Sequence, residues 1–151
     1  MSTITAPPAH CPPRCVALAR SRHAPAVARK VTARWLATDD TASTIAADVV
    51  LVVSELVTNT LRHTRGPCLL TLTTDGSVVE VAVTDTSEEP PRLHGTGCPG
   101  ERGGYGIAMI VELGARVTVE PIPHGKTVHA ALALRPDVGP GREAVTAHRP
   151  E

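Results

Sequence analysis

Aromatic side chains are almost missing from this sequence of 151 residues, since they make up 1% of it as Trp35 and Tyr105, and there is no phenylalanine. The core must therefore be built from Val, Leu, Ile and Ala, and hydrophobic residues as a whole reach 42%. An aliphatic core of this kind suits helices packed on a sheet. The length allows one domain with a substantial core and falls short of what two domains need.

The sequence also lacks an excess of either charge and lacks a long apolar run. Lys and Arg number 15, as do Asp and Glu, so the formal net charge is +0 and does not favour nucleic-acid binding. The longest apolar stretches, such as residues 49–53, are far below the roughly 18 residues of a membrane span. Residues 1–15 are Pro-rich, without the apolar segment of a signal peptide. We expect a soluble cytoplasmic protein that binds neither nucleic acid nor membrane.

The cysteines are few and scattered, at Cys11, Cys15, Cys68 and Cys98. Cys11 and Cys15 with His10 could form half of a zinc site, but no second pair of ligands follows at a suitable spacing. Free thiols in a reducing compartment are the favoured interpretation.

Hydrophobic periodicity and turn residues divide the chain into strands and helices. The expected elements are a strand at 14–20, a helix at 24–37, a helix from N-cap residues 39–41 to residue 63, strands at 68–73 and 77–85, a short helix at 105–113, and strands at 115–120 and 126–134. This order predicts an α+β two-layer sandwich, with a mainly antiparallel mixed sheet and helices on one face. Residues 1–13 are expected to be flexible, 135–151 to be a disordered tail, and 86–104 to be a long functional loop.

The second helix carries polar side chains at Glu55, Asn59 and His63, which a spacing of four residues places on one stripe. A helical wheel puts Glu55 at the edge of the apolar face, Asn59 closer in and His63 at its centre. Mg²⁺ prefers oxygen ligands such as an amide oxygen and phosphates, and a carboxylate one turn away can activate a nucleophile. The alternative is a satisfied core histidine beside an exposed glutamate.

Two further segments carry candidate binding residues. Asp85 ends a buried strand, where its carboxylate could accept a hydrogen bond from the N6 amino group of adenine or could begin a turn. Glycines at 100–106 lead into a short helix and could admit a phosphate, with Arg102 adding a charged contact, or could form only a flexible joint.

Together the run SELVTNTLRH at 54–63, Asp85, Gly104-Tyr105-Gly106 and Gly125-Lys126-Thr127-Val128 resembles the boxes of the GHKL (histidine kinase-like) ATPase superfamily. The resemblance covers residues 14–134 and is strongest to the small anti-sigma-factor serine/threonine kinases. It implies a Bergerat-type ATP-binding domain over 14–134. The implied roles are Mg²⁺ ligation by Asn59, general-base catalysis by Glu55 and adenine recognition by Asp85. Gly104 and Gly106 would shape the lid over the phosphates with Thr127 assisting, and Arg62 and His63 would flank the nucleotide.

The resemblance is incomplete around the aspartate box. Ser87 and Glu89 stand where glycines are usual, and Glu88 and Glu89 place negative charge near the phosphates, so weakened ATP affinity is expected. His129 replaces an aromatic residue that is frequent in the small relatives.

The resemblance implies a kinase that transfers the γ-phosphate of ATP to Ser or Thr of a small antagonist protein. The alternative is a non-catalytic ATP-binding regulator that sequesters a protein partner such as a sigma factor. The ATPase half of a histidine kinase is disfavoured, because residues 1–23 do not supply a phosphoacceptor helix pair. A purely structural domain is disfavoured because all the motifs would have to be coincidental. Homodimerisation is a further expectation that the sequence leaves open.

Overall fold

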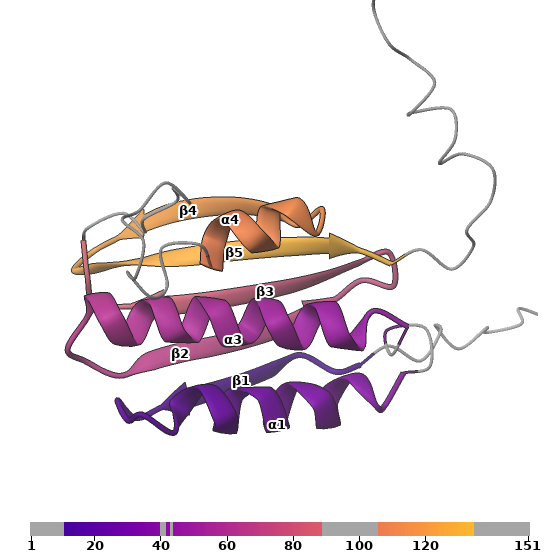
Figure 1. Ribbon diagram of the computed structural model, residues 1–151, viewed down its shortest axis with the longest axis horizontal. Coiled ribbons are helices and arrows are strands. Elements are labelled where there is room, and N and C mark those ends of the chain that lie inside the picture. The colour runs from indigo at the N-terminus through magenta and orange to yellow at the C-terminus, as the bar shows by residue number, and fades with distance from the viewer. Residues whose placement is uncertain (1–10, 40–41, 43, 89–105, 135–151) are drawn as a thin grey trace, which may run out of the picture.

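The computed structural model describes residues 11–39, 42, 44–88 and 106–134, which form one sheet covered by helices on one face (Figure 1). The strands are β1 (Arg14–Leu18), β2 (Cys68–Thr74), β3 (Val78–Asp85), β4 (Arg116–Ile122) and β5 (Gly125–Ala133). They lie in the order β1-β2-β3-β5-β4, and every neighbouring pair is antiparallel. The helices are α1 (Ala24–Leu36), α3 (Ala46–His63) and α4 (Gly106–Glu112). The predicted α+β fold is confirmed.

The core lies between the sheet and the helices, and it is aliphatic as the composition predicts. In β3 the residues Val79, Val81 and Val83 are at most 1% exposed, whereas the alternate residues point to the other face of the sheet. The apolar stripe of α3 is fully or almost fully buried and consists of Val49, Val52, Val53, Leu56 and Val57. Helix α3 packs on the centre of the sheet and between α1 and α4 (Figure 1).

Among the described residues, Trp35 is the one aromatic residue in the core, and it lies at the C-terminal end of α1. Its indole N–H donates a hydrogen bond to the carbonyl of Pro12, and the thiol of Cys11 donates to the Trp35 carbonyl at 3.2 Å. These two bonds fasten the segment before β1 to the end of α1.

Both hairpins are closed by residues suited to tight turns. In the β2–β3 turn, Asp75 Oδ1 accepts the N–H groups of Ser77 and Val78, and Gly76 has φ 90°. The predicted hairpin at Asp75-Gly76 is therefore present. In the β4–β5 turn, His124 adopts φ 61°, and a Cβ on Gly125 would collide with the carbonyl oxygen of Asp85. Gly125 thus lets the start of β5 approach the end of β3 closely.

Element bounds differ from the expected ones in ways that the packing explains. Strand β4 continues through Pro121 because it is an edge strand, where a missing backbone N–H is tolerated. Helix α3 begins at Ala46, after the expected N-cap residues at 39–41, of which 40 and 41 lie outside the described residues. Residues 1–10 of the expected flexible segment, the expected tail, and residues 89–104 of the expected loop also fall outside them. Residues 11–13 are described, and Cys11 and Pro12 are hydrogen-bonded to Trp35. None of the described helices is long and apolar enough to cross a membrane.

Candidate functional site

The C-terminal end of β3, the first residues of β5 and the C-terminal half of α3 meet at one end of the sheet, on the left in Figure 1. Asp85 is the last residue of β3, and it is paired in register with Lys126 of β5. Thr60 of α3 reaches the same carboxylate from the helix layer. The site therefore combines a helix and two strands that are brought together only by folding.

Asp85 is buried and fully engaged in hydrogen bonds. Lys126 Nζ lies 3.0 Å from both carboxylate oxygens. The backbone N–H of Ser87 donates to Oδ1 at 2.9 Å, and the Thr60 hydroxyl donates to Oδ2 at 3.3 Å. The side chains of Lys126 and Asp85 are 4% and 1% exposed, so this is a buried ion pair. Lys126 Nζ also donates to the Ser87 carbonyl at 3.4 Å.

Asn59 and Glu55 occupy adjacent turns of α3. Asn59 is 8% exposed, and its amide forms no hydrogen bond with any other described residue. Glu55, one turn earlier, is half-buried. Among the described residues no side-chain N or O atom is both buried and without a hydrogen-bond partner, so the Asn59 amide reaches solvent although the residue as a whole is buried. An accessible amide that the protein does not engage is suited to bind a ligand or a metal. The pair offers a neutral oxygen ligand and a carboxylate one turn apart.

His63 does not lie at the centre of the buried face, so this expectation is wrong. His63 and Arg62 are both exposed in the last turn of α3. The helical wheel extends the apolar stripe to the end of the helix, but the buried residues of α3 end at Thr60. Beyond that point Arg20 donates to the carbonyls of Leu61 and Thr64, at 3.2 and 3.1 Å, and thereby caps the helix.

Thr127 is separated from the other predicted residues by the sheet. It pairs with Thr84 of β3, and their hydroxyls are 2.8 Å apart. Paired residues share a face and successive residues alternate, so Thr127 points away from the helices while Lys126 points towards them. Gly106 begins α4. Gly104 and Arg102 lie outside the described residues.

Sequence reasoning missed Lys126 as a site residue. The signal was present in β5, where Val128, Ala130 and Leu132 mark the buried face at every second position. Lys126 falls on that same face, but the resemblance of residues 125–128 to a nucleotide-binding box assigned a role only to Thr127. A buried lysine requires an anion, and Asp85 provides it.

Cys68, at the start of β2, belongs to the same electrostatic environment. Burial raises the pKa of its thiol, and the negative charge of Asp85 raises it further, to about 11. The thiol is therefore protonated at neutral pH and is not a nucleophile.

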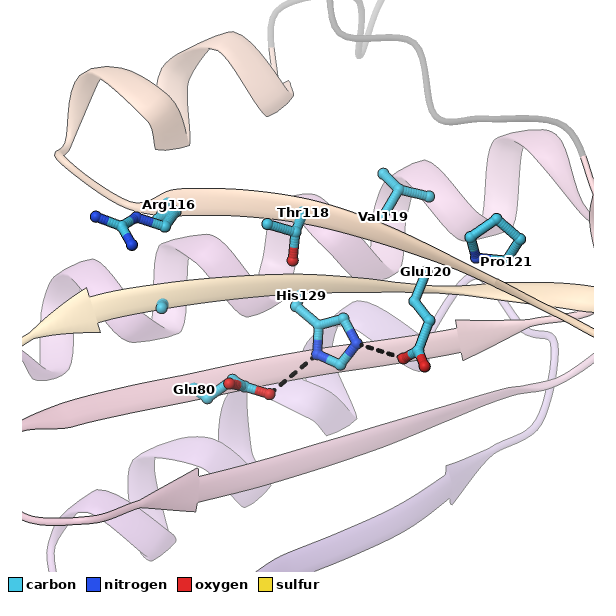
Figure 2. A pocket seen from close by; sticks show the side chains of 8 residues that line it. Glu80, Arg116, Thr118, Val119, Glu120, Pro121 and His129 are labelled. Atoms are coloured by element: carbon cyan, nitrogen blue, oxygen red, sulfur yellow. Dashed lines mark hydrogen bonds and ion pairs between the residues drawn. The ribbon is translucent and has the colours of Figure 1, made fainter.

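A second polar cluster lies on the open face of the sheet, away from the helices (Figure 2). His129 bridges Glu80 of β3 and Glu120 of β4, with ring nitrogens 2.9 and 3.0 Å from their carboxylates. The cluster borders a hollow of about 590 Å³ whose lining also includes Arg116 and Thr118. Because Asp85 points to the helix-covered face of the sheet and Asn59 belongs to α3, this hollow is separate from the site at the end of β3.

Residues 17–132 match the family described as the histidine kinase-like ATPase domain. The chain belongs to this family. Its fold is shared by a structure of the RsbU and RsbW domains of Rv1364c from Mycobacterium tuberculosis, with a TM-score of 0.58 and 21% identity over 83% of this chain and 33% of that chain. A histidine kinase domain from the blue-light activated histidine kinase of Erythrobacter litoralis EL346 gives a TM-score of 0.42 and 27% identity, over 59% of this chain and 47% of that chain.

This chain spans about a third of the first structure and about half of the second. No curated protein matches the sequence. Family membership implies binding of ATP. The described residues fit the phosphate end of that ligand better than they fit the adenine end. Asn59 and Glu55 suit a phosphate-bound Mg²⁺, whereas Asp85 is already occupied by Lys126.

Proposed function

We propose that this protein is an ATP-binding regulator with serine/threonine kinase activity towards a partner protein. The observation that carries the proposal is the placement of Glu55 and Asn59 on successive turns of α3, where the Asn59 amide is accessible and makes no hydrogen bond to other described residues. The partner classes suggested by the sequence resemblance are an anti-sigma-factor antagonist and a sigma factor.

Bound ATP with Mg²⁺ would supply the transferable phosphoryl group. Asn59 is suited to hold the metal through its side-chain oxygen, which is a hard ligand without charge. Glu55 is half-buried and is suited to accept the proton of a Ser or Thr hydroxyl placed beside it. Such a positioned base typically contributes about a hundredfold or more to the rate.

A second candidate function is favoured by the ion pair between Lys126 and Asp85. If this pair keeps adenine from its usual acceptor, the protein binds nucleotide weakly and acts by capturing a partner rather than by phosphorylating it. The two candidates differ in whether Glu55 matters for activity.

The test compares wild type with Glu55→Gln, which preserves size and removes the base. Asp48→Asn is the matched control, because Asp48 is a half-buried carboxylate in the first turn of the same helix. Binding is measured by calorimetric titration with Mg-ATP, and transfer is measured from γ-labelled ATP to an array of Ser- and Thr-containing peptides.

We expect Glu55→Gln to bind ATP as wild type does and to lose transfer by about a hundredfold or more, with Asp48→Asn unchanged. Equal, measurable transfer by wild type and Glu55→Gln would refute the role of Glu55 as the base. Saturable binding without transfer in any variant would favour the second candidate.

A further inference from the structure

We infer that Lys126 is a specificity-determining residue that acts against adenine, because its ammonium group occupies the carboxylate that would read the base. The inference rests on the proposed function, in that it concerns ATP at the same site. It predicts that removing the ammonium group strengthens ATP binding, whereas loss of a lysine near a triphosphate would ordinarily weaken it.

The first argument is the hydrogen-bonding capacity of Asp85. An ionised carboxylate has about four lone-pair sites, two on each oxygen. In this structure Oδ1 accepts from Lys126 and from the Ser87 N–H, and Oδ2 accepts from Lys126 and from Thr60. An adenine amino group would have to displace one of these donors before Asp85 could bind it.

The second argument is burial. The ammonium group and the carboxylate are both almost completely excluded from solvent, so salt screens their attraction little. Breaking such a pair by removing one partner leaves an uncompensated buried charge. Lys126 must therefore find a new anion or reach water when adenine replaces it at Asp85, and this requirement lowers the affinity for ATP.

The third argument is that the backbone holds Lys126 in place. Asp85 and Lys126 are paired in register across β3 and β5. Gly125 is packed so closely against the Asp85 carbonyl that no Cβ could be accommodated there. Only the side chain of Lys126 is then free to move, and it would swing away from Asp85 for adenine to bind.

The test replaces Lys126 with threonine, which cannot reach the carboxylate as the ammonium does. The sequence contains only two lysines, so Lys30→Thr on the exposed surface of α1 is the matched control. Wild type and both variants are titrated calorimetrically with Mg-ATP and with Mg-ITP, whose base carries a carbonyl oxygen in place of the N6 amino group. Thermal unfolding checks that each variant is folded.

We expect Lys126→Thr to bind Mg-ATP at least tenfold more tightly than wild type, with a smaller change for Mg-ITP and none for Lys30→Thr. Should Lys126→Thr fail to fold, Lys126→Gln removes the charge while keeping a hydrogen-bond donor, and it should show a gain of the same sign.

Unchanged or weaker ATP binding in the folded Lys126 variant would overturn the inference and leave the proposed function standing. An equal gain with ATP and ITP would overturn it as well, because the effect would not concern the base. Absence of ATP binding in every variant would overturn the proposed function together with the inference.

Discussion

At the scale of single residues, the buried charge of Asp85 affects a thiol that makes no hydrogen bond with it. The pKa of Cys68 is raised to about 11, first by burial and then by Asp85. At pH 8 a thiol with this pKa is ionised in only about one molecule in a thousand. Cys15 on β1, by contrast, is exposed.

We therefore predict that Cys68 reacts much more slowly than Cys15 with iodoacetamide at pH 8. Mass spectrometry of digested samples taken over time would give both rates in one experiment. Urea-unfolded protein serves as the control, in which the two cysteines should react at similar rates. Equal rates in the folded protein would show that Cys68 is neither buried nor affected by Asp85.

The sequence predicts which site residues lie together when they belong to one helix or strand. It does not predict pairs of residues that only the fold brings into contact. Glu55 and Asn59 lie on one helix, so their spacing alone brings them together. Lys126 and Asp85 are 41 residues apart, and only the β3–β5 register makes them partners. The burial of His63 was predicted wrongly because a helical wheel gives only the direction of a side chain. It does not show that the packing against α3 ends before the last turn of the helix.

At the scale of elements, His129 links β5 to both of its neighbouring strands. Burial lowers the pKa of His129, but the hydrogen bonds to Glu120 and Glu80 and their negative charges raise it more, so the net pKa is raised above its usual value. A group with a raised pKa in the folded state stabilises the fold fully below its unfolded pKa of about 6.5. That stabilisation disappears as the pH rises through the folded pKa.

We predict that the free energy of unfolding decreases as the pH rises from about 6 through the folded pKa of His129, and that His129→Gln removes this decrease. The difference should stay below about 1 kcal/mol, because Glu80 and Glu120 are 46% and 63% exposed and solvent screens the pairs. Urea unfolding at several pH values measures it. A pH dependence that is identical in His129→Gln would rule out this linkage.

At the scale of the whole molecule, the described helices cover one face of the sheet and leave the other open. Leu69 and Leu70 are neighbours in β2 and point to opposite faces. Leu70 is fully buried beneath the helices, whereas Leu69 is 37% exposed on the open face. The elements that form this layering agree closely with those expected from hydrophobic alternation and helical periodicity, because these patterns reflect burial on a single face.

We predict that Leu70→Ala destabilises the protein by about 2–5 kcal/mol, through lost burial and the cavity left behind. Leu69→Ala serves as the matched control and should cost about 0.5 kcal/mol or less. Chemical denaturation monitored by circular dichroism compares the two. A large cost for Leu69→Ala would mean that the open face is covered in solution.

Because Trp35 is hydrogen-bonded to Pro12 and Cys11, its fluorescence is an intrinsic probe of the segment before β1 and not of nucleotide binding. Trp35 is the sole tryptophan, and it lies at the C-terminal end of α1, opposite the end of the sheet that holds Asp85 (Figure 1). Its emission therefore reports whether the segment before β1 stays docked. A spectral change caused by a partner protein would place that partner's influence at the far end of the molecule from the site.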